Sequence, residues 1–233
     1  AVIGTGLANE SASALLAYPT IVVASCFGLS IYVSHLLGRY RAVAADAEQR
    51  LRAEAHVSSA LARVGRELIA SLDTGELLDR LAQLTVEVFH CNASQTWMRD
   101  GEGLFRVAAG VSDDPEELAA LHTLHLPEAA VGTLIERLRR DGPVTLTPTE
   151  IAALPTATLS RRHAVGHVLF LPLRKGEEVV GVHTVVFRGS EALDPTAPQL
   201  GAGIAQLASL ALETARLVEA MNAADRLKTE FLA

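Results

Sequence analysis

Two strongly apolar segments joined by a short charged turn place the tightest limit on how this chain can fold. The first segment is VLFLPL at residues 168–173, the second is VVGVHTVVF at 179–187, and RKGEE lies between them. Apolar runs at this spacing predict an antiparallel β-hairpin. A sheet that is wetted on one face alternates apolar and polar residues, and neither segment does so. We therefore expect helices to cover both faces of this sheet.

The neighbouring segments predict the other elements of an α+β domain. LDTGELLDRLAQLTVEVFH reads as an amphipathic helix with Asp73 as its N-cap. ASQTWMR and LFRVAAG, separated by the turn DGEG, read as two antiparallel strands. A second helix is expected near Ala130–Arg140, a short strand in DGPVTLT, and a long helix from APQLGAGIAQLASLALETARLVEAMN into the last residues.

A long stretch near the start of the chain has no formally charged side chain, from Ser11 to Gly38. A bilayer core about 30 Å thick needs roughly 20 apolar residues in a helix, and Pro19–Leu37 meets that length. Arginines follow directly, which favours a cytoplasmic position for the rest of the chain. We therefore expect one transmembrane helix within residues 1–38, with a buried core helix or a cleaved signal peptide as the alternatives. The expected anchor residues are Tyr18, Pro19, Arg39 and Arg41.

Residues 39–67 are rich in alanine, glutamate and arginine, which is typical of a linker helix. An apolar seam in and just after this segment alternates by four and three residues, as the a and d positions of a coiled coil do. The seam consists of Val57, Leu61, Val64 and Leu68. We expect this helix to pair with that of a second copy, the alternative being a single helix whose last turns pack on the next domain.

The composition of the chain limits which partners and which kinds of site can be expected. The formal net charge is −7 and no basic stripe is present, so nucleic acid is not an expected partner. Cys26 and Cys91 do not form a disulfide framework. The histidine pairs at 122/125 and 163/167 have helix-face spacings, but no cysteine accompanies either pair and no metal site is predicted. The sequence contains no catalytic constellation and requires no cofactor.

In this order the elements resemble a GAF domain over residues 68–218. The likeness is carried by LLDRLAQLTVEVFHCNASQTWMRD, GPVTLT, VLFLPLRKGEEVVGVHTVVF and LGAGIAQLASLALETARL. The resemblance implies a twisted antiparallel sheet between helices, with a pocket over one sheet face that either holds a small molecule or is empty. The candidate pocket residues are Trp97, Phe105, Phe170, Arg161, Arg162 and His163. The two arginines suit an anionic ligand, with a solvated loop as the alternative. The asparagine-lysine-phenylalanine signature of cyclic-nucleotide-binding relatives is missing.

The closing residues AADRLKTEFLA resemble the start of the dimerisation and phosphoacceptor helix of sensor histidine kinases. The matching residues are Leu227, Lys228, Glu230, Phe231, Leu232 and Ala233. The resemblance implies that residues 219–233 begin this helix and that the phosphoacceptor histidine and the ATP-binding domain follow in a longer protein. It also implies a homodimer, a downstream response regulator as partner, and a place in the bacterial cytoplasmic membrane with the GAF-like domain in the cytoplasm. Signal transmission is assigned to Leu217, Leu227 and Phe231.

The sequence thus predicts the signal-input half of a two-component sensor histidine kinase. Its fold class is α+β, with one transmembrane helix, a linker helix, a GAF-like sheet flanked by helices, and a long exit helix. Another function class stays open, in which the chain is a non-catalytic membrane-anchored docking subunit of a larger membrane complex. A third, an input domain for a different output enzyme such as a cyclase, is disfavoured by LKTEFLA.

Overall fold

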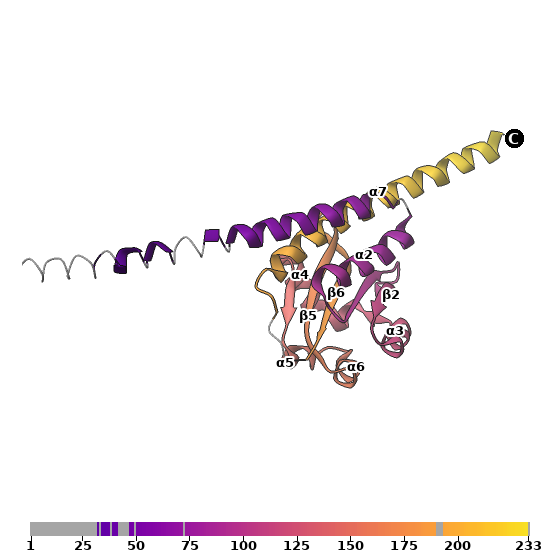
Figure 1. Cartoon of the computed structure of the whole chain (residues 1–233). Coiled ribbons are helices and arrows are strands. Elements are labelled where there is room, and N and C mark those ends of the chain that lie inside the picture. The colour runs from indigo at the N-terminus through magenta and orange to yellow at the C-terminus, as the bar shows by residue number, and fades with distance from the viewer. Residues whose placement is uncertain are drawn as a thin grey trace, which may run out of the picture. The chain divides into compact units, whose positions relative to one another are not determined.

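The computed structural model describes residues 32, 34–37, 39–41, 47–48, 50–71, 73–189 and 193–232. The chain divides into two units, Ala1–Glu54 and Ala55–Ala233, and the second contains the folded domain (Figure 1). The boundary lies inside a helical segment, residues 50–69.

The described residues form a six-stranded antiparallel sheet with the order β3-β2-β1-β6-β5-β4. The strands are β1 (Ala93–Arg99), β2 (Leu104–Ser112), β3 (Leu126–Pro127), β4 (Val144–Leu146), β5 (Val165–Lys175) and β6 (Glu178–Arg188). The hairpin predicted from the two apolar segments is confirmed, because β5 and β6 pair from Val165↔Arg188 to Lys175↔Glu178.

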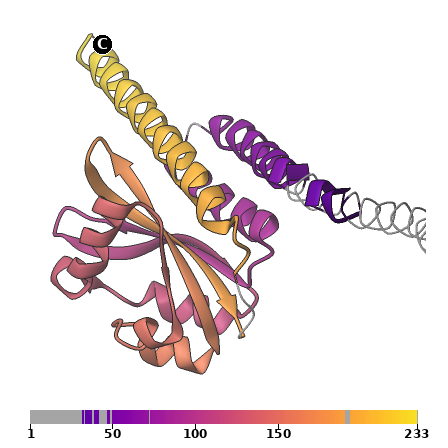
Figure 2. The same ribbon diagram turned by 90° about the vertical axis from the view of Figure 1, so that its left-hand side faces the viewer.

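Helices cover both faces of this sheet, as its apolar strands predict (Figures 1 and 2). They are α2 (Thr74–Phe89), α3 (Pro115–His122), α4 (Glu128–Asp141), α5 (Pro148–Ile151), α6 (Ala157–Arg162) and α7 (Ala197–Leu232). Asp73 caps α2 as predicted, because its carboxylate accepts a hydrogen bond of 2.9 Å from the Glu76 amide.

The sheet separates two hydrophobic cores. On one face, Leu169, Leu171 and Leu173 of β5 pack with the buried leucines of α2 and α7. On the other face, Val168 and Phe170 of the same strand pack with α3, α4 and α5. Successive side chains of a strand point to opposite faces, so one apolar strand serves both cores.

The predicted seam of residues 57–68 lies in the first core. Val57, Val64 and Leu68 are buried there, and Leu61 packs on α7. A methyl group at Gly203 would lie 2.6 Å from a Leu61 methyl carbon, so α7 approaches this helix closely. The seam is therefore occupied by the chain's own last helix. Pairing with a second copy stays a prediction.

The transmembrane helix in the predicted fold class was wrong. Among the described residues, none of the helices is both long and apolar enough to span a bilayer. A span needs roughly 20 apolar residues in one helix, and α7 carries charged side chains from Glu213 onward. Of Pro19–Leu37 the structure describes only residues 32 and 34–37, and Tyr18 and Pro19 lie outside the described residues. Arg39 and Arg41 are exposed helical residues. The bilayer as partner and the membrane localisation depended on this helix, and neither is tested by the described residues.

Candidate ligand cavity

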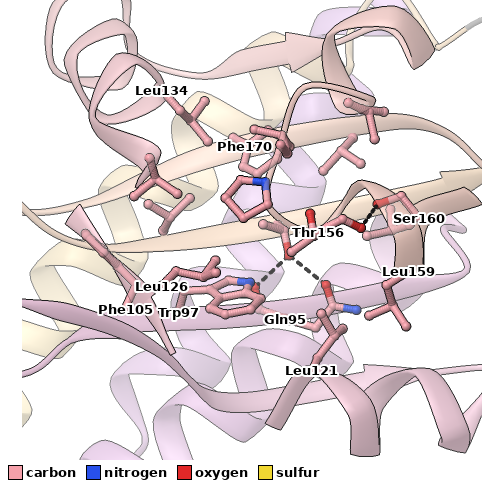
Figure 3. Close-up of a pocket in the computed structure, with 18 of the residues that line it drawn as sticks. Gln95, Trp97, Phe105, Leu121, Leu126, Leu134, Thr156, Leu159, Ser160 and Phe170 are labelled. Carbon is pink, nitrogen blue, oxygen red and sulfur yellow. Dashed lines mark hydrogen bonds between the residues drawn. The ribbon is translucent and has the colours of Figure 1, made fainter. Parts of the chain in front are cut away.

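A cavity of about 90 Å³ lies between the sheet and the helices of the second face (Figure 3). Strands β1, β2, β3, β5 and β6 supply one side of it, and the helices α3 to α6 with the loop between α5 and α6 supply the rest. Its lining residues are Gln95, Trp97, Phe105, Glu117, Leu121, Leu126, Val131, Leu134, Ile135, Ile151, Leu154, Pro155, Thr156, Leu159, Ser160, Val165, Val168, Phe170, Val182, Thr184 and Val186. The lining is mainly apolar with a few polar groups, which is typical of small-molecule sites.

The three aromatic residues proposed from the sequence come together at this cavity. Trp97 of β1, Phe105 of β2 and Phe170 of β5 are buried and line it. Whether they contact a ligand stays a prediction.

The three basic candidates do not line the cavity. Arg161 and Arg162 are exposed, and Arg162 lies 3.3 Å from Glu116. His163 is buried, but its Nδ1 pairs with Asp114 at 2.7 Å. Leu159 and Ser160 of α6 line the cavity instead. Since each helical residue turns by about 100°, the next two residues leave the cavity side.

A polar pair that the sequence interpretation missed lies among the apolar lining. The hydroxyl of Thr184 donates to Gln95 Oε1 at 2.8 Å and lies 3.0 Å from the Gln95 carbonyl oxygen. Gln95 is only 3% exposed, and its Nε2 has no hydrogen-bond partner in the described part of the chain. Figure 3 shows this amide beside Trp97, which lies two residues further along β1 on the same face. In the sequence SQTW, the two-residue spacing between Gln95 and Trp97 was the signal that could have placed Gln95 on the cavity face of the strand.

One buried ion pair stands at the edge of the cavity. The Glu117 carboxylate accepts from Arg188 Nη2 at 2.7 Å and from the Ser112 hydroxyl at 2.9 Å. Arg188 also pairs with Asp113 at 2.8 Å and donates to the His163 carbonyl oxygen at 3.0 Å. These bonds connect α3, the end of α6 and the end of β6. They also balance the charge of Glu117, which is the only charged side chain among the described residues of the cavity lining.

A second buried polar group lies on the opposite face of the sheet. His183 of β6 is fully buried between the Thr85, Ser94 and Thr96 hydroxyls, at 2.8–2.9 Å. Burial lowers the pKa of His183 to about 3, so the ring is neutral at pH 7. Burial also raises the pKa of the nearby Cys91 thiol to about 12, which makes this thiol unreactive.

The residues assigned to signal transmission lie on α7. Leu217 is 61% exposed, Leu227 is also exposed, and Phe231 belongs to the helix. The Glu219 carboxylate accepts from the Thr74 amide at 2.8 Å and so joins α7 to the first turn of α2. The role of these residues in transmission stays a prediction. Among the described residues, no group of three or more histidine, cysteine, aspartate or glutamate side chains could hold a metal ion.

The sheet order, the helices on both faces and the cavity over one face define a GAF-like domain, and solved structures support this class. The chain matches the GAF domain of the Acinetobacter phosphoenolpyruvate-protein phosphotransferase with a TM-score of 0.56 and 17% identity, over 69% of this chain and 94% of that one. It matches the GAF domain of the corresponding Coxiella burnetii protein with a TM-score of 0.60 and 15% identity, over 71% and 97%.

A third similar structure is the phycoerythrobilin-bound GAF domain from a cyanobacterial phytochrome, with a TM-score of 0.57 and 10% identity over 70% of this chain and 97% of that one. No family model and no curated protein matches the chain. At these identities the likeness establishes the fold, and the predicted GAF-like fold is confirmed.

Proposed function

We propose that this chain is a signal-input module. In this proposal a small molecule in the cavity shifts the sheet, and α7 carries the shift to an output domain. The proposal depends on one observation, which is that strand β5 contacts both the cavity and α7. Val168 and Phe170 line the cavity. A side-chain carbon at Gly201 of α7 would lie 2.7 Å from Leu171 and 3.1 Å from Leu169. Packed interfaces this close respond to displacement by changing their packing.

The proposed module acts as a homodimer through the last turns of α7. Ala215 is the last fully buried residue of this helix among its described side chains. Beyond it, Leu217 and Met221 are 61% and 68% exposed and lie four residues apart. Residues at this spacing share one helix face. This apolar face suits packing against the same helix of a second copy. Such a helix pair would couple the two GAF-like domains of the dimer.

The proposed output is a histidine kinase core outside residues 1–233, with a response regulator as its downstream partner. Its support is the resemblance of AADRLKTEFLA to the start of a kinase dimerisation helix. The described part of α7 reaches Leu232 without a break, so the helix runs through these residues. A continuous packed helix has discrete alternative arrangements and can therefore convey a state.

The test uses the product of the complete reading frame that encodes this chain, purified and incubated with labelled ATP. We expect acid-labile phosphohistidine. We expect Leu217→Glu to weaken self-association and to change the rate of phosphorylation about tenfold, because it puts a charge on the apolar face. The matched control is Asn222→Glu, which lies about 140° away on the helix and should change neither quantity. A product without phosphohistidine would refute the kinase output and favour a docking subunit.

A further inference from the structure

A ligand in the cavity would meet one buried group that lacks a hydrogen-bond partner, the Gln95 amide. Its Nε2 is enclosed and has no partner among the residues that the structure describes, while its Oε1 already accepts a hydrogen bond from Thr184. A buried donor without an acceptor is unfavourable, and a ligand that pairs with it removes this cost. The cavity therefore favours a ligand with one polar group beside Gln95.

That polar group must suit the amide in either orientation. The Thr184 hydroxyl lies 2.8 Å from the amide and 3.0 Å from the Gln95 carbonyl oxygen. If the amide turned over, its NH₂ would donate to Thr184, Thr184 would donate to the carbonyl, and Oε1 would be left unpaired. A hydroxyl, which both donates and accepts, pairs with the amide in both cases.

The charges around the cavity disfavour an ion as ligand. Among the described residues that line the cavity, Glu117 is the only charged one, and Arg188 pairs with it at 2.7 Å. Arg161 and Arg162 are exposed and do not line the cavity. An anion would therefore enter without a cationic partner, and an unpaired charge is costly to bury.

The size of the cavity limits the rest of the ligand. An apolar cavity of about 150 Å³ holds benzene, so about 90 Å³ encloses roughly four non-hydrogen atoms of a ligand. Leu154, Thr156 and Ser160 are partly exposed, so the remaining atoms of a single ring would extend toward solvent on this side. The enclosed volume is far too small for a tetrapyrrole.

We propose that the cavity binds a small uncharged molecule with a single apolar ring and one hydroxyl-like group, which pairs with Gln95. This inference rests on the proposed function in taking the cavity as the sensory site. It goes further by naming the chemical class of the signal and the residue that selects it.

The test compares phenol, toluene and benzoate, which share a ring and differ in one group. Trp97 is the single tryptophan of the chain and lines the cavity, so its fluorescence reports occupancy. Calorimetry on the 233-residue chain gives the affinities. We expect phenol to bind about tenfold more tightly than toluene, and benzoate to bind more weakly than both. In Gln95→Leu we expect toluene to bind at least as tightly as phenol.

The matched control is Arg161→Ala, which should leave the affinities of all three probes unchanged. If Gln95→Leu does not fold by circular dichroism, Gln95→Met provides the second variant, since it also removes the amide at nearly unchanged side-chain size and should abolish the preference for phenol. Tightest binding of benzoate would overturn the uncharged class while leaving the cavity as a ligand site. Tightest binding of toluene would overturn the role of Gln95. Saturation by none of the probes would overturn the ligand class, whereas the output domain is tested separately by phosphorylation.

Discussion

Gln95 and His183 are buried polar side chains on neighbouring strands, but they differ in how far their hydrogen bonds are satisfied. Both ring nitrogens of His183 have hydroxyl partners, at 2.8–2.9 Å. Gln95 Nε2 has none. A fully paired buried group fixes packing, and an unpaired one in a cavity is available to a ligand. His183 is therefore a structural residue in this account, and Gln95 is the recognition residue.

The hydrogen bonds of His183 also fix its tautomer. The Thr85 hydroxyl donates to the Leu81 carbonyl oxygen at 2.7 Å, so it can only accept from His183. Nε2 then carries the hydrogen, with the Thr85 and Ser94 hydroxyls both accepting from it, and Nδ1 accepts from Thr96. A second proton on the ring would have to displace the Thr96 donor within a dry core, which agrees with the lowered pKa.

This pairing predicts a pH-dependent stability. The pKa of His183 is about 3 in the folded chain, against 6.5 as its ordinary value, so between these values the unfolded chain binds a proton that the folded chain does not. The stability that the neutral ring contributes is complete above pH 6.5 and is lost as the pH falls. We expect the free energy of unfolding, from urea titrations followed by Trp97 fluorescence, to fall by about 2 kcal/mol between pH 7 and pH 5.

The matched variant is His183→Gln, which keeps polar partners for the hydroxyls and cannot titrate. Between pH 7 and pH 5 the free energy of unfolding of this variant should fall by about 2 kcal/mol less than that of the unaltered chain. Equal pH dependence in the two proteins would show that His183 is not the titrating group.

Among the elements, the helix over residues 50–69 shows what periodicity can and cannot predict. The spacing of its apolar residues correctly identified the face that is buried. It did not identify the partner, because a heptad seam looks the same whether it packs on a second copy or on another helix of the chain. Here α7 covers it, through Gly203 beneath Leu61.

This packing predicts unequal effects for two adjacent leucine-sized side chains. Leu68 is 0% exposed and Ile69 is 66% exposed. Leu68→Ala should lower the free energy of unfolding by about 2–5 kcal/mol, because it leaves a cavity in the core. Ile69→Ala should change it by less than about 0.5 kcal/mol. Urea titrations of the two variants make the comparison, and similar losses would mean that this helix does not pack on the domain as described.

For the molecule as a whole, the order of elements in the sequence was enough to predict the GAF-like fold. The apolar hairpin required cover on both faces, and the caps and turns around it limited the topology. The transmembrane helix predicted from hydropathy was wrong, because none of the described helices is long and apolar enough to span a bilayer. Of the residues that line the cavity, only the three aromatic ones were predicted from the sequence. Its chemistry depends on residues from Gln95 to Val186, which only the folded sheet brings together.

The central claim is that occupancy of the cavity alters α7 on the far side of the sheet. Hydrogen exchange of the 233-residue chain, measured by mass spectrometry with and without saturating phenol, tests it directly. We expect slower exchange in α6 and a change of about threefold or more in α7 near residues 216–227, and smaller changes in Gln95→Leu at the same phenol concentration, because this variant binds phenol more weakly. Protection confined to α6, with exchange in α7 unaltered, would contradict the claim.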